Sequence, residues 1–105
     1  MWRVEYLKEA VEDLKRLDHS QRLQVLKAID KVSTNPLPQN EGGYGKPLGN
    51  KNSLRLSGYL KIKLKRLGIR VVYKVVREKD VIKVIVVSAR ANDEVYLLAQ
   101  KRTDK

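Results

Sequence analysis

Apolar residues and lysines alternate one by one between residues 60 and 65, and this alternation constrains the fold more than any other feature of the chain. Side chains of a β-strand point alternately to its two faces, so a period of two is typical of a strand with one buried side. The sequence therefore predicts a strand whose core-facing residues are Leu60, Ile62 and Leu64 and whose outward-facing residues are Lys61, Lys63 and Lys65.

Two more strands are predicted after this one. A turn from Arg66 to Gly68 precedes the strand Ile69–Val76, and a turn from Glu78 to Asp80 precedes the strand Val81–Ala89. Short turns of this kind join antiparallel strands. Because Val81–Ala89 is almost continuously apolar, we expect it to lie centrally in the sheet.

The N-terminal third predicts a short strand and two helices. Trp2–Tyr6 has strand character, and apolar residues then recur at helical spacing over residues 7–17. Asp18 or Ser20 can cap the second helix, since Gln21 stands three residues after Asp18 in the capping-box position. The residues expected to be buried on the second helix are Leu23, Val25, Leu26, Ile29 and Val32.

The remaining segments are a long connector and a short final helix. Residues 35–52 are rich in Pro, Gly, Asn and Gln, which predicts a loop with little structure of its own. Asn92 or Asp93 can cap a helix that ends near Lys101. The order β-α-α-β-β-β-α predicts a single α+β domain over residues 1–105, with a small antiparallel sheet, an N-terminal helical hairpin and a short C-terminal helix. We expect the helices to pack on one face of the sheet.

The charge of the chain indicates a polyanionic partner. Its 105 residues include 23 Lys and Arg against 12 Asp and Glu, a formal net charge of +11, which is more than solubility alone requires. The absence of cysteine excludes disulfides and thiolate chemistry, and the single His19 lacks a second histidine as its acid partner. Because cysteine is absent, we expect a cytoplasmic protein, and because no apolar run has membrane-spanning length, we expect no membrane partner. We expect no cofactor.

Several cations are expected to converge on one phosphate. Alternate residues of a strand lie about 6.6 to 7 Å apart, close to the spacing of phosphates along a nucleic-acid strand. Arg70 follows the next turn, Arg90 closes the last strand, and Tyr96 enters the final helix. Alternating lysines also keep an open sheet face hydrated, and for the lysines alone this second interpretation has equal weight. A nucleotide-binding loop at Gly42 to Lys46 is disfavoured, because Pro47 replaces the Ser or Thr that would hold magnesium.

The run YLKIKLKRLGIRVVYKVVREKDVIKVIVVSARANDEVY resembles the C-terminal half of RelE, an mRNA-cleaving toxin family of toxin–antitoxin pairs. SARANDEVY is its most specific part, whereas AVEDLKRL is common across the wider RelE and ParE superfamily. The resemblance implies a catalytic set of Lys61, Lys63, Arg70, Arg90 and Tyr96. We expect Lys65, Arg66 and Lys74 to add RNA contacts.

The resemblance implies a metal-independent endonuclease that enters the ribosomal A site and cuts mRNA through the ribose 2′-hydroxyl. Its implied partners are mRNA on the ribosome, ribosomal RNA, and an acidic RelB-like antitoxin whose hetero-oligomer with the toxin binds promoter DNA through the antitoxin. Two alternatives remain at this point. One is a ParE-like inhibitor of DNA gyrase that binds without cutting, and the other is a non-catalytic RNA-binding or ribosome-associated module.

A lysine base is hard to justify in such a site. Lowering a lysine pKa from about 10.4 to about 7 needs about 4.6 kcal/mol. One cation about 7 Å away supplies only about 2.4 kcal/mol at an effective dielectric constant of about 20. We therefore expect slow cutting of naked RNA and a dependence on the ribosome for substrate alignment.

Overall fold

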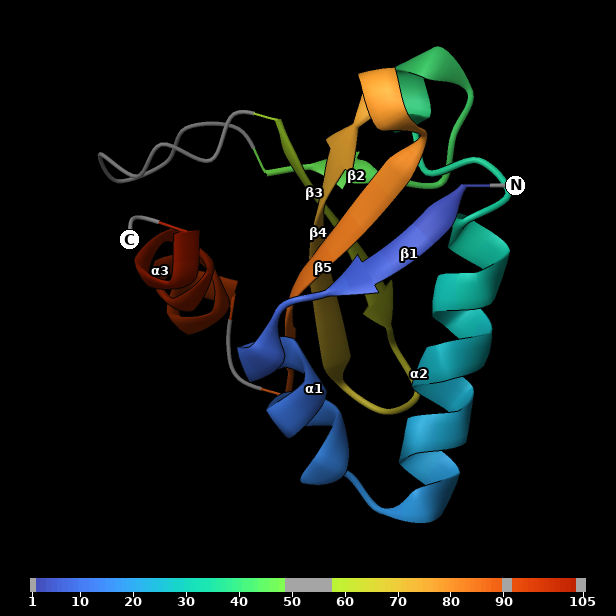
Figure 1. The fold of residues 1–105 in the computed structure, drawn as a ribbon. Coiled ribbons are helices and arrows are strands. Elements are labelled where there is room, and N and C mark those ends of the chain that lie inside the picture. The colour runs from blue at the N-terminus through green and yellow to red at the C-terminus, as the bar shows by residue number, and fades with distance from the viewer. Residues whose placement is uncertain (1, 49–57, 90–91, 104–105) are drawn as a thin grey trace.

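A computed structural model describes residues 2–48, 58–89 and 92–103 of the chain (Figure 1). Its strands are β1 (Arg3–Tyr6), β2 (Lys46–Pro47), β3 (Tyr59–Leu64), β4 (Ile69–Val76) and β5 (Val81–Ser88). Its α-helices are α1 (Lys8–Lys15), α2 (His19–Val32) and α3 (Asn92–Thr103), and its 3₁₀ turns are η1 (Gln39–Glu41) and η2 (Arg77–Lys79). The predicted α+β class is confirmed, and no helix in the described ranges is long and apolar enough to cross a membrane.

The strands form one mixed sheet in the order β1-β5-β4-β3-β2. The hairpins β3–β4 and β4–β5 are antiparallel as predicted, and β5 lies between two neighbours. The expectation of a wholly antiparallel sheet is wrong, because β1 pairs with β5 in parallel. The chain leaves β1 into a helical hairpin instead of a tight turn, and a crossover of this length permits parallel pairing.

The helices occupy both faces of the sheet, so the expectation that they share one face is wrong (Figure 1). On one face, Ala10, Leu14, Val25 and Ile29 of the helical hairpin α1–α2 form a core with β4 and β5. On the other face, Val95 and Ala99 of α3 pack against Val72, Ile85 and Val86. The long apolar β5 is therefore covered from both sides, which explains its composition.

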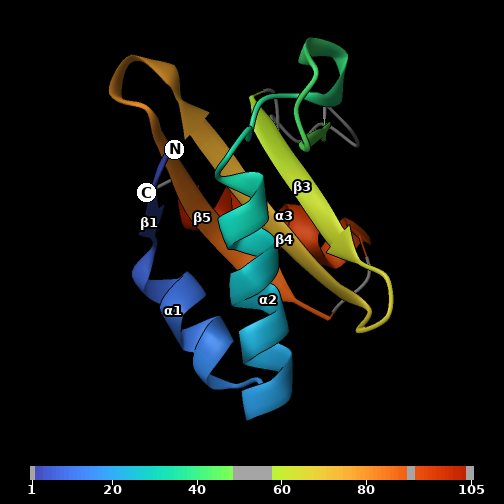
Figure 2. The same cartoon turned by 90° about the vertical axis from the view of Figure 1, so that its right-hand side faces the viewer.

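Local signals fix the helical hairpin. The amide of Gln21 donates to Asp18 Oδ1 at 2.8 Å and the amide of Asp18 donates to Gln21 Oε1 at 3.2 Å, which confirms the capping box. Figure 2 shows α2 lying across β3 and β4. Leu23 and Leu26 were predicted to be buried but are exposed, because the sheet covers only the α2 stripe that carries Val25, Ile29 and Val32.

The connector after α2 is more ordered than its composition suggested. It contains η1 and the short strand β2, whose Lys46 and Pro47 pair with Lys61 and Leu60 of β3. Proline is tolerated there because β2 is the edge strand of the sheet. The expectation of a loop with little structure is therefore wrong over residues 35–48, and residues 49–52 lie outside the described part.

Candidate nucleic-acid interface

The register of the sheet places cations directly opposite one another. Residues that pair across antiparallel strands point to the same face, and their Cβ atoms lie about 4.5 to 5.5 Å apart. Three pairs of this kind are cationic on both sides: Lys46 with Lys61, Lys63 with Arg70, and Lys74 with Lys83. All six residues lie on the face that also carries Val72 and α3.

Like charges in opposite positions destabilise a sheet. Glu5 of β1 pairs with Lys83 and relieves the third pair, whereas no carboxylate stands opposite the first two pairs in the register of the described strands, so stability does not explain those two. An open sheet face can be kept hydrated by residues of either charge, or by serine and threonine. A face that carries cations in opposed pairs is instead suited to a ligand with several negative charges, because each anionic group reduces the repulsion beneath it. This register favours the anion-binding interpretation over that of a merely hydrated face.

Tyr96 lies against the lysine row but does not present its ring. The Nζ of Lys61 donates to the Tyr96 hydroxyl at 2.5 Å and lies 5.2 Å from the ring centroid. The ring itself is buried, at 5% exposure, among Tyr59, Val72 and Val95. A base cannot stack on this ring in the conformation seen, so the contact available to Tyr96 is through its hydroxyl, which orients Lys61.

A buried ion pair attaches α3 to the rest of the molecule. Arg102 donates from both terminal nitrogens to the carboxylate of Asp13 on α1, at 2.7 and 3.0 Å, and also donates to the carbonyl of Ile85 at 2.8 Å. Asp13 in turn accepts from the amide of Val87 at 3.0 Å. The β4–β5 register is irregular at this point, since Val72 pairs with Val86 while Tyr73 pairs with Val84. The side chains thus satisfy backbone groups beside the bulge.

The structure brings together some of the predicted site residues and separates others. Lys61, Lys63 and Arg70 are neighbours on β3 and β4, with Tyr96 bonded to the first of them. Arg70 is also paired with Ser88 near the end of β5. Arg90 lies outside the described residues.

The three residues predicted to add RNA contacts are dispersed. Lys65 lines the same groove as Lys61 and Lys63, whereas Arg66 lies in the β3–β4 turn and lines a different hollow beside α2. Lys74 lies four residues along β4 from Arg70, about 13 Å away, with its Nζ 5.6 Å from the Tyr59 ring centroid. Lys74 therefore belongs to the far end of the cationic face, beside Lys83.

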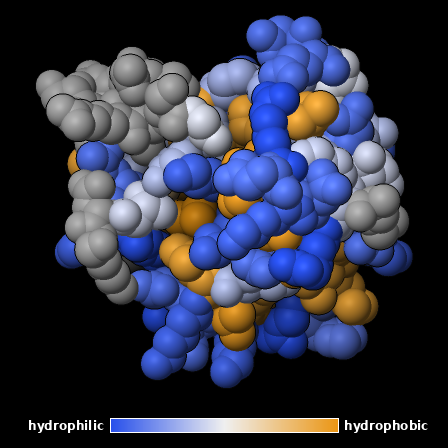
Figure 3. Space-filling view, turned by 45° about the horizontal axis from the view of Figure 1, so that its top comes forward, coloured by the Kyte–Doolittle hydropathy of each residue, from blue (hydrophilic) through white to orange (hydrophobic). Residues whose placement is uncertain are grey.

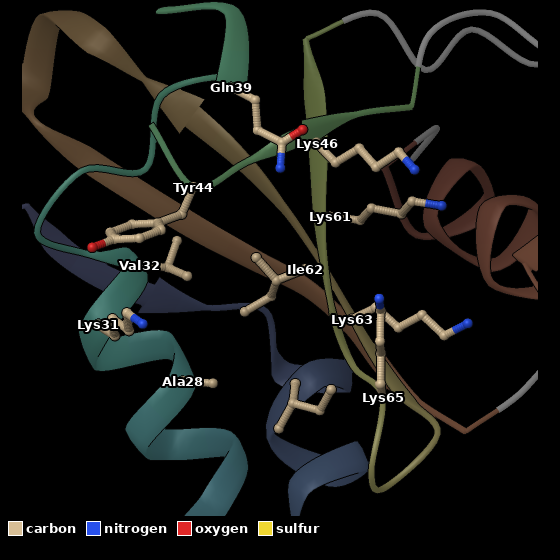
Figure 4. A pocket seen from close by; sticks show the side chains of 11 residues that line it. Ala28, Lys31, Val32, Gln39, Tyr44, Lys46, Lys61, Ile62, Lys63 and Lys65 are labelled. Carbon is tan, nitrogen blue, oxygen red and sulfur yellow. The ribbon is translucent and has the colours of Figure 1, made fainter. Parts of the chain in front are cut away.

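Three further residues of the same surface were missed by sequence reasoning. A groove of about 640 Å³ runs along β3, and its lining includes Lys31, Tyr44 and Lys46 besides the predicted lysines. Figure 4 shows Lys46, Lys61 and Lys63 on one side of β3 and Tyr44 with Lys31 on the other. Lys46 escaped prediction because its segment lacks any strand pattern, and only the register with Lys61 reveals its position. In the described ranges no three metal-ligating side chains gather in one place.

Comparison with known proteins shows the family to which the chain belongs. The family described as "ParE toxin of type II toxin-antitoxin system, parDE" matches residues 4–94. A putative RelE-like toxin protein of Escherichia coli is 31% identical over 105 residues, covering 96% of each chain.

Solved structures agree with this family. Isolated E. coli RelE matches with a TM-score of 0.70 and 28% identity, covering 97% of this chain and 98% of the other. The intact E. coli RelBE toxin–antitoxin complex matches with a TM-score of 0.70 and 26% identity, covering 88% and 100%. The chain therefore belongs to the ParE toxin family of type II toxin–antitoxin systems and, within the RelE and ParE superfamily, is a toxin of the RelE type.

Proposed function

We propose that the protein is a ribosome-dependent, metal-independent mRNA endonuclease that inhibits translation. The observation that carries this proposal is the pairing of Lys63 with Arg70 beside Lys61, on the sheet face that also carries α3. In the proposed reaction a ribose 2′-hydroxyl gives its proton to a neutral lysine of the set or to solvent, and its oxygen attacks the adjacent phosphorus. The bond to the 5′-oxygen of the next nucleotide breaks, and that oxygen gains a proton. The products are a cyclic phosphate and a 5′-hydroxyl end.

The side chains divide this work according to their chemistry. Arginine remains charged and offers a planar fork of donors, so Arg70, together with Arg90, stabilises the dianionic transition state. Lys63 holds the same phosphate from the opposite strand. The Tyr96 hydroxyl fixes Lys61, which reduces the rotamer freedom that a free lysine would lose on binding. The leaving oxygen takes its proton from Arg90 or from a lysine, and that side chain regains its charge by taking a proton from solvent.

Alignment by the ribosome supplies what this site lacks. The cations stabilise charge, but in-line attack also requires the mRNA backbone to be bent and held. No ring of the set is open for stacking in this conformation, because Tyr96 is buried. An mRNA already stretched across an empty A site arrives with much of this ordering complete.

The first prediction concerns Arg70. Arg70→Ala should lower the single-turnover rate on ribosome-bound mRNA by at least about 10²-fold, the scale of losing one transition-state donor. Arg3→Ala is the matched control, because Arg3 is an exposed arginine on the distant edge strand β1. Its rate should stay within about twofold of wild type. A near-normal rate for Arg70→Ala, or equal wild-type rates with and without ribosomes, contradicts the proposal.

The same protein is proposed to bind an acidic RelB-like antitoxin. The net charge of +11 and the structural likeness to RelE in the E. coli RelBE complex support this partner. The antitoxin would cover the cationic face, and the hetero-oligomer would bind promoter DNA through the antitoxin. An adjacent open reading frame should encode a small acidic protein whose co-expression restores growth.

A second candidate function is gyrase inhibition, which the ParE family match favours. Induction in cells separates the two. New mRNA ends inside translated codons support the nuclease, whereas DNA damage signalling with intact messages supports the gyrase inhibitor.

A further inference from the structure

The groove along β3 extends beyond the residues that the proposed reaction uses. Its lining includes the five lysines Lys31, Lys46, Lys61, Lys63 and Lys65, and no carboxylate belongs to it within the described residues. Only Lys61 and Lys63 have roles at the scissile phosphate. Of the remaining cations, Lys46 lies beside Lys61, Lys65 lies near Lys63 at the end of β3, and Lys31 lies across β3 near the end of α2 (Figure 4).

An exposed tyrosine stands at the far end of this groove. Tyr44 is 44% exposed, and the Nζ of Lys31 lies 5.4 Å from its ring centroid. Large apolar side chains on a surface are common, but this one lies beside cations in a hollow instead of on a convex surface. An aromatic ring among lysines is the combination that binds single-stranded nucleic acid, since every base has a face that can stack.

The loop that carries Tyr44 is built to hold it in place. The Tyr44 amide donates to the carbonyl of Asn35 at 3.1 Å, and the Gly45 amide donates to that of Leu37 at 3.1 Å. A Cβ on Gly43 would lie 2.0 Å from the Leu37 carbonyl oxygen, and one on Gly45 would lie 2.4 Å from the Tyr73 hydroxyl. The two glycines that flank Tyr44 therefore let the loop backbone pack closely against Leu37 and Tyr73.

A second clamp ties the same loop to the sheet. Arg77 in η2 donates to both carboxylate oxygens of Glu41 in η1, at 3.0 and 2.7 Å. The Arg77 hydrogen bonds hold the pKa of Glu41 below its ordinary value, so the pair stays charged at neutral pH. The loop is thus braced on both sides of Tyr44, and its backbone needs little ordering when a ligand binds.

The spacing of the groove suits consecutive nucleotides. Lys46 lies one strand spacing, about 4.8 Å, from its partner Lys61. Tyr44 precedes Lys46 by two residues and lines the same groove, on the other side of β3 (Figure 4). A strand whose scissile phosphate rests on Lys61 and Lys63 can therefore place its next phosphate near Lys46 and, where it passes over β3, a base near Tyr44.

We propose that Tyr44, with Lys31 and Lys46, forms an RNA subsite outside the cleavage position, where Tyr44 stacks on a base and the lysines hold the flanking phosphates. The subsite rests on the proposed function, because it extends the substrate strand of that reaction. The groove could instead seat an acidic peptide against the edge of β3, since β2 pairs only with Leu60 and Lys61. The lysine-rich lining without a carboxylate, within the described residues, and the exposed Tyr44 ring favour RNA.

The test measures affinity for RNA that cannot be cut. Two 2′-O-methyl single strands are used as probes, one of about 12 nucleotides and one of about four, which spans only the cleavage position. Tyr44→Ala should weaken binding of the longer strand about tenfold and leave the shorter strand unchanged. Tyr44→Phe is the matched control, because it keeps the ring and removes only the hydroxyl. It should bind both strands within about twofold of wild type.

The outcomes separate this subsite from the proposed nuclease. Unchanged affinity of Tyr44→Ala for the longer strand overturns the subsite, and so does an equal loss in Tyr44→Phe, which would implicate the hydroxyl instead of the ring. If Tyr44→Ala weakens the binding of an acidic peptide but not the binding of either RNA strand, the groove is a peptide site and the proposal fails. Wild-type cleavage of ribosome-bound mRNA is measured in parallel. If wild type cleaves ribosome-bound mRNA but binds the long and short strands equally well, the subsite proposal alone fails. If wild type does not cleave, the proposed nuclease function fails.

Discussion

At the scale of single residues, Tyr73 shows how the sheet supports the Tyr44 loop from beneath. Its side chain is 1% exposed, and its hydroxyl donates to the carbonyl of Pro36 at 2.8 Å. Pro36 is itself fully buried, so no water can replace this donor. Burial raises the pKa of Tyr73, which keeps the phenol protonated and able to donate over the whole physiological range.

Removing that hydroxyl should destabilise the fold measurably. Tyr73→Phe leaves the Pro36 carbonyl buried without its donor, at a cost of about 1 to 2 kcal/mol in the free energy of unfolding. Urea denaturation followed by Trp2 fluorescence or circular dichroism measures the change. Tyr44→Phe removes a hydroxyl from an exposed position and should be neutral. Equal stability of the two variants would show that the Tyr73 hydrogen bond contributes nothing net.

At the scale of elements, the attachment of α3 depends on one buried ion pair. The side chains of Arg102 and Asp13 are only 10% and 6% exposed, and they join α3 to α1 while satisfying two backbone groups of β5. Arg16 reaches the same carboxylate at 3.4 Å but is 75% exposed. The Asp13 carboxylate is therefore paired with one buried and one solvated arginine, so the stability contributions of the two pairs can be compared within one protein.

We predict that the buried cation, Arg102, contributes to the free energy of unfolding and that the solvated cation, Arg16, contributes little. Arg102→Met should lower the free energy of unfolding by about 3 kcal/mol, because it leaves Asp13 buried with much of its compensation lost. Arg16→Met should change it by less than about 1 kcal/mol. The double variant Asp13→Leu with Arg102→Met should recover part of the loss, since no buried charge remains but the Val87 amide and the Ile85 carbonyl still lack their side-chain partners. Denaturant titration of the four proteins checks this order, and equal effects of Arg102→Met and Arg16→Met would contradict it.

Elements coded by local chemistry could be predicted from the sequence. The strand β3 follows from its period of two, and the start of α2 follows from Asp18 and Gln21. Features that depend on pairing between distant segments of the chain could not be predicted from the sequence. The direction of β1, the face chosen by α3 and the existence of β2 are set by contacts between segments far apart in the chain. No local sequence pattern predicts these three features.

The candidate site divides in the same way. Lys61 and Lys63 could be predicted from the alternation of apolar residues and lysines, and Arg70 and Tyr96 from the resemblance to a family pattern. Lys46 and Lys31 reach the same groove only through the folded chain. The burial of the Tyr96 ring was also invisible in the sequence, because it follows from the docking of α3 on Val72 and Ile85. Resemblance identified which residues belong together, and packing determined what each can do.

At the scale of the whole molecule, charge determines which partners the protein meets. Hydrophilic side chains cover much of the face seen in Figure 3, with apolar residues showing between them. A net charge of +11 attracts any polyanion, so charge alone cannot distinguish cellular RNA from an antitoxin. What distinguishes them is the nature of the remaining contacts. An antitoxin that folds on binding would add apolar anchors, whereas the proposed RNA binding to this face would be carried mainly by lysine–phosphate contacts.

Salt should therefore separate the two partners. Binding of single-stranded RNA through about four phosphate contacts predicts a slope near −3 for the logarithm of affinity against the logarithm of salt concentration. Lys46→Ala removes one of these contacts and should make the slope shallower by about 0.7, whereas Lys8→Ala, a lysine on the far side at the start of α1, should leave it unchanged. The antitoxin complex should show a much shallower slope than RNA, because apolar burial is not screened by ions. Titrations of both ligands at several salt concentrations measure all of these slopes. Equal slopes for RNA and antitoxin would mean that the antitoxin is held by charge alone, and raised salt would then release the toxin from both partners together.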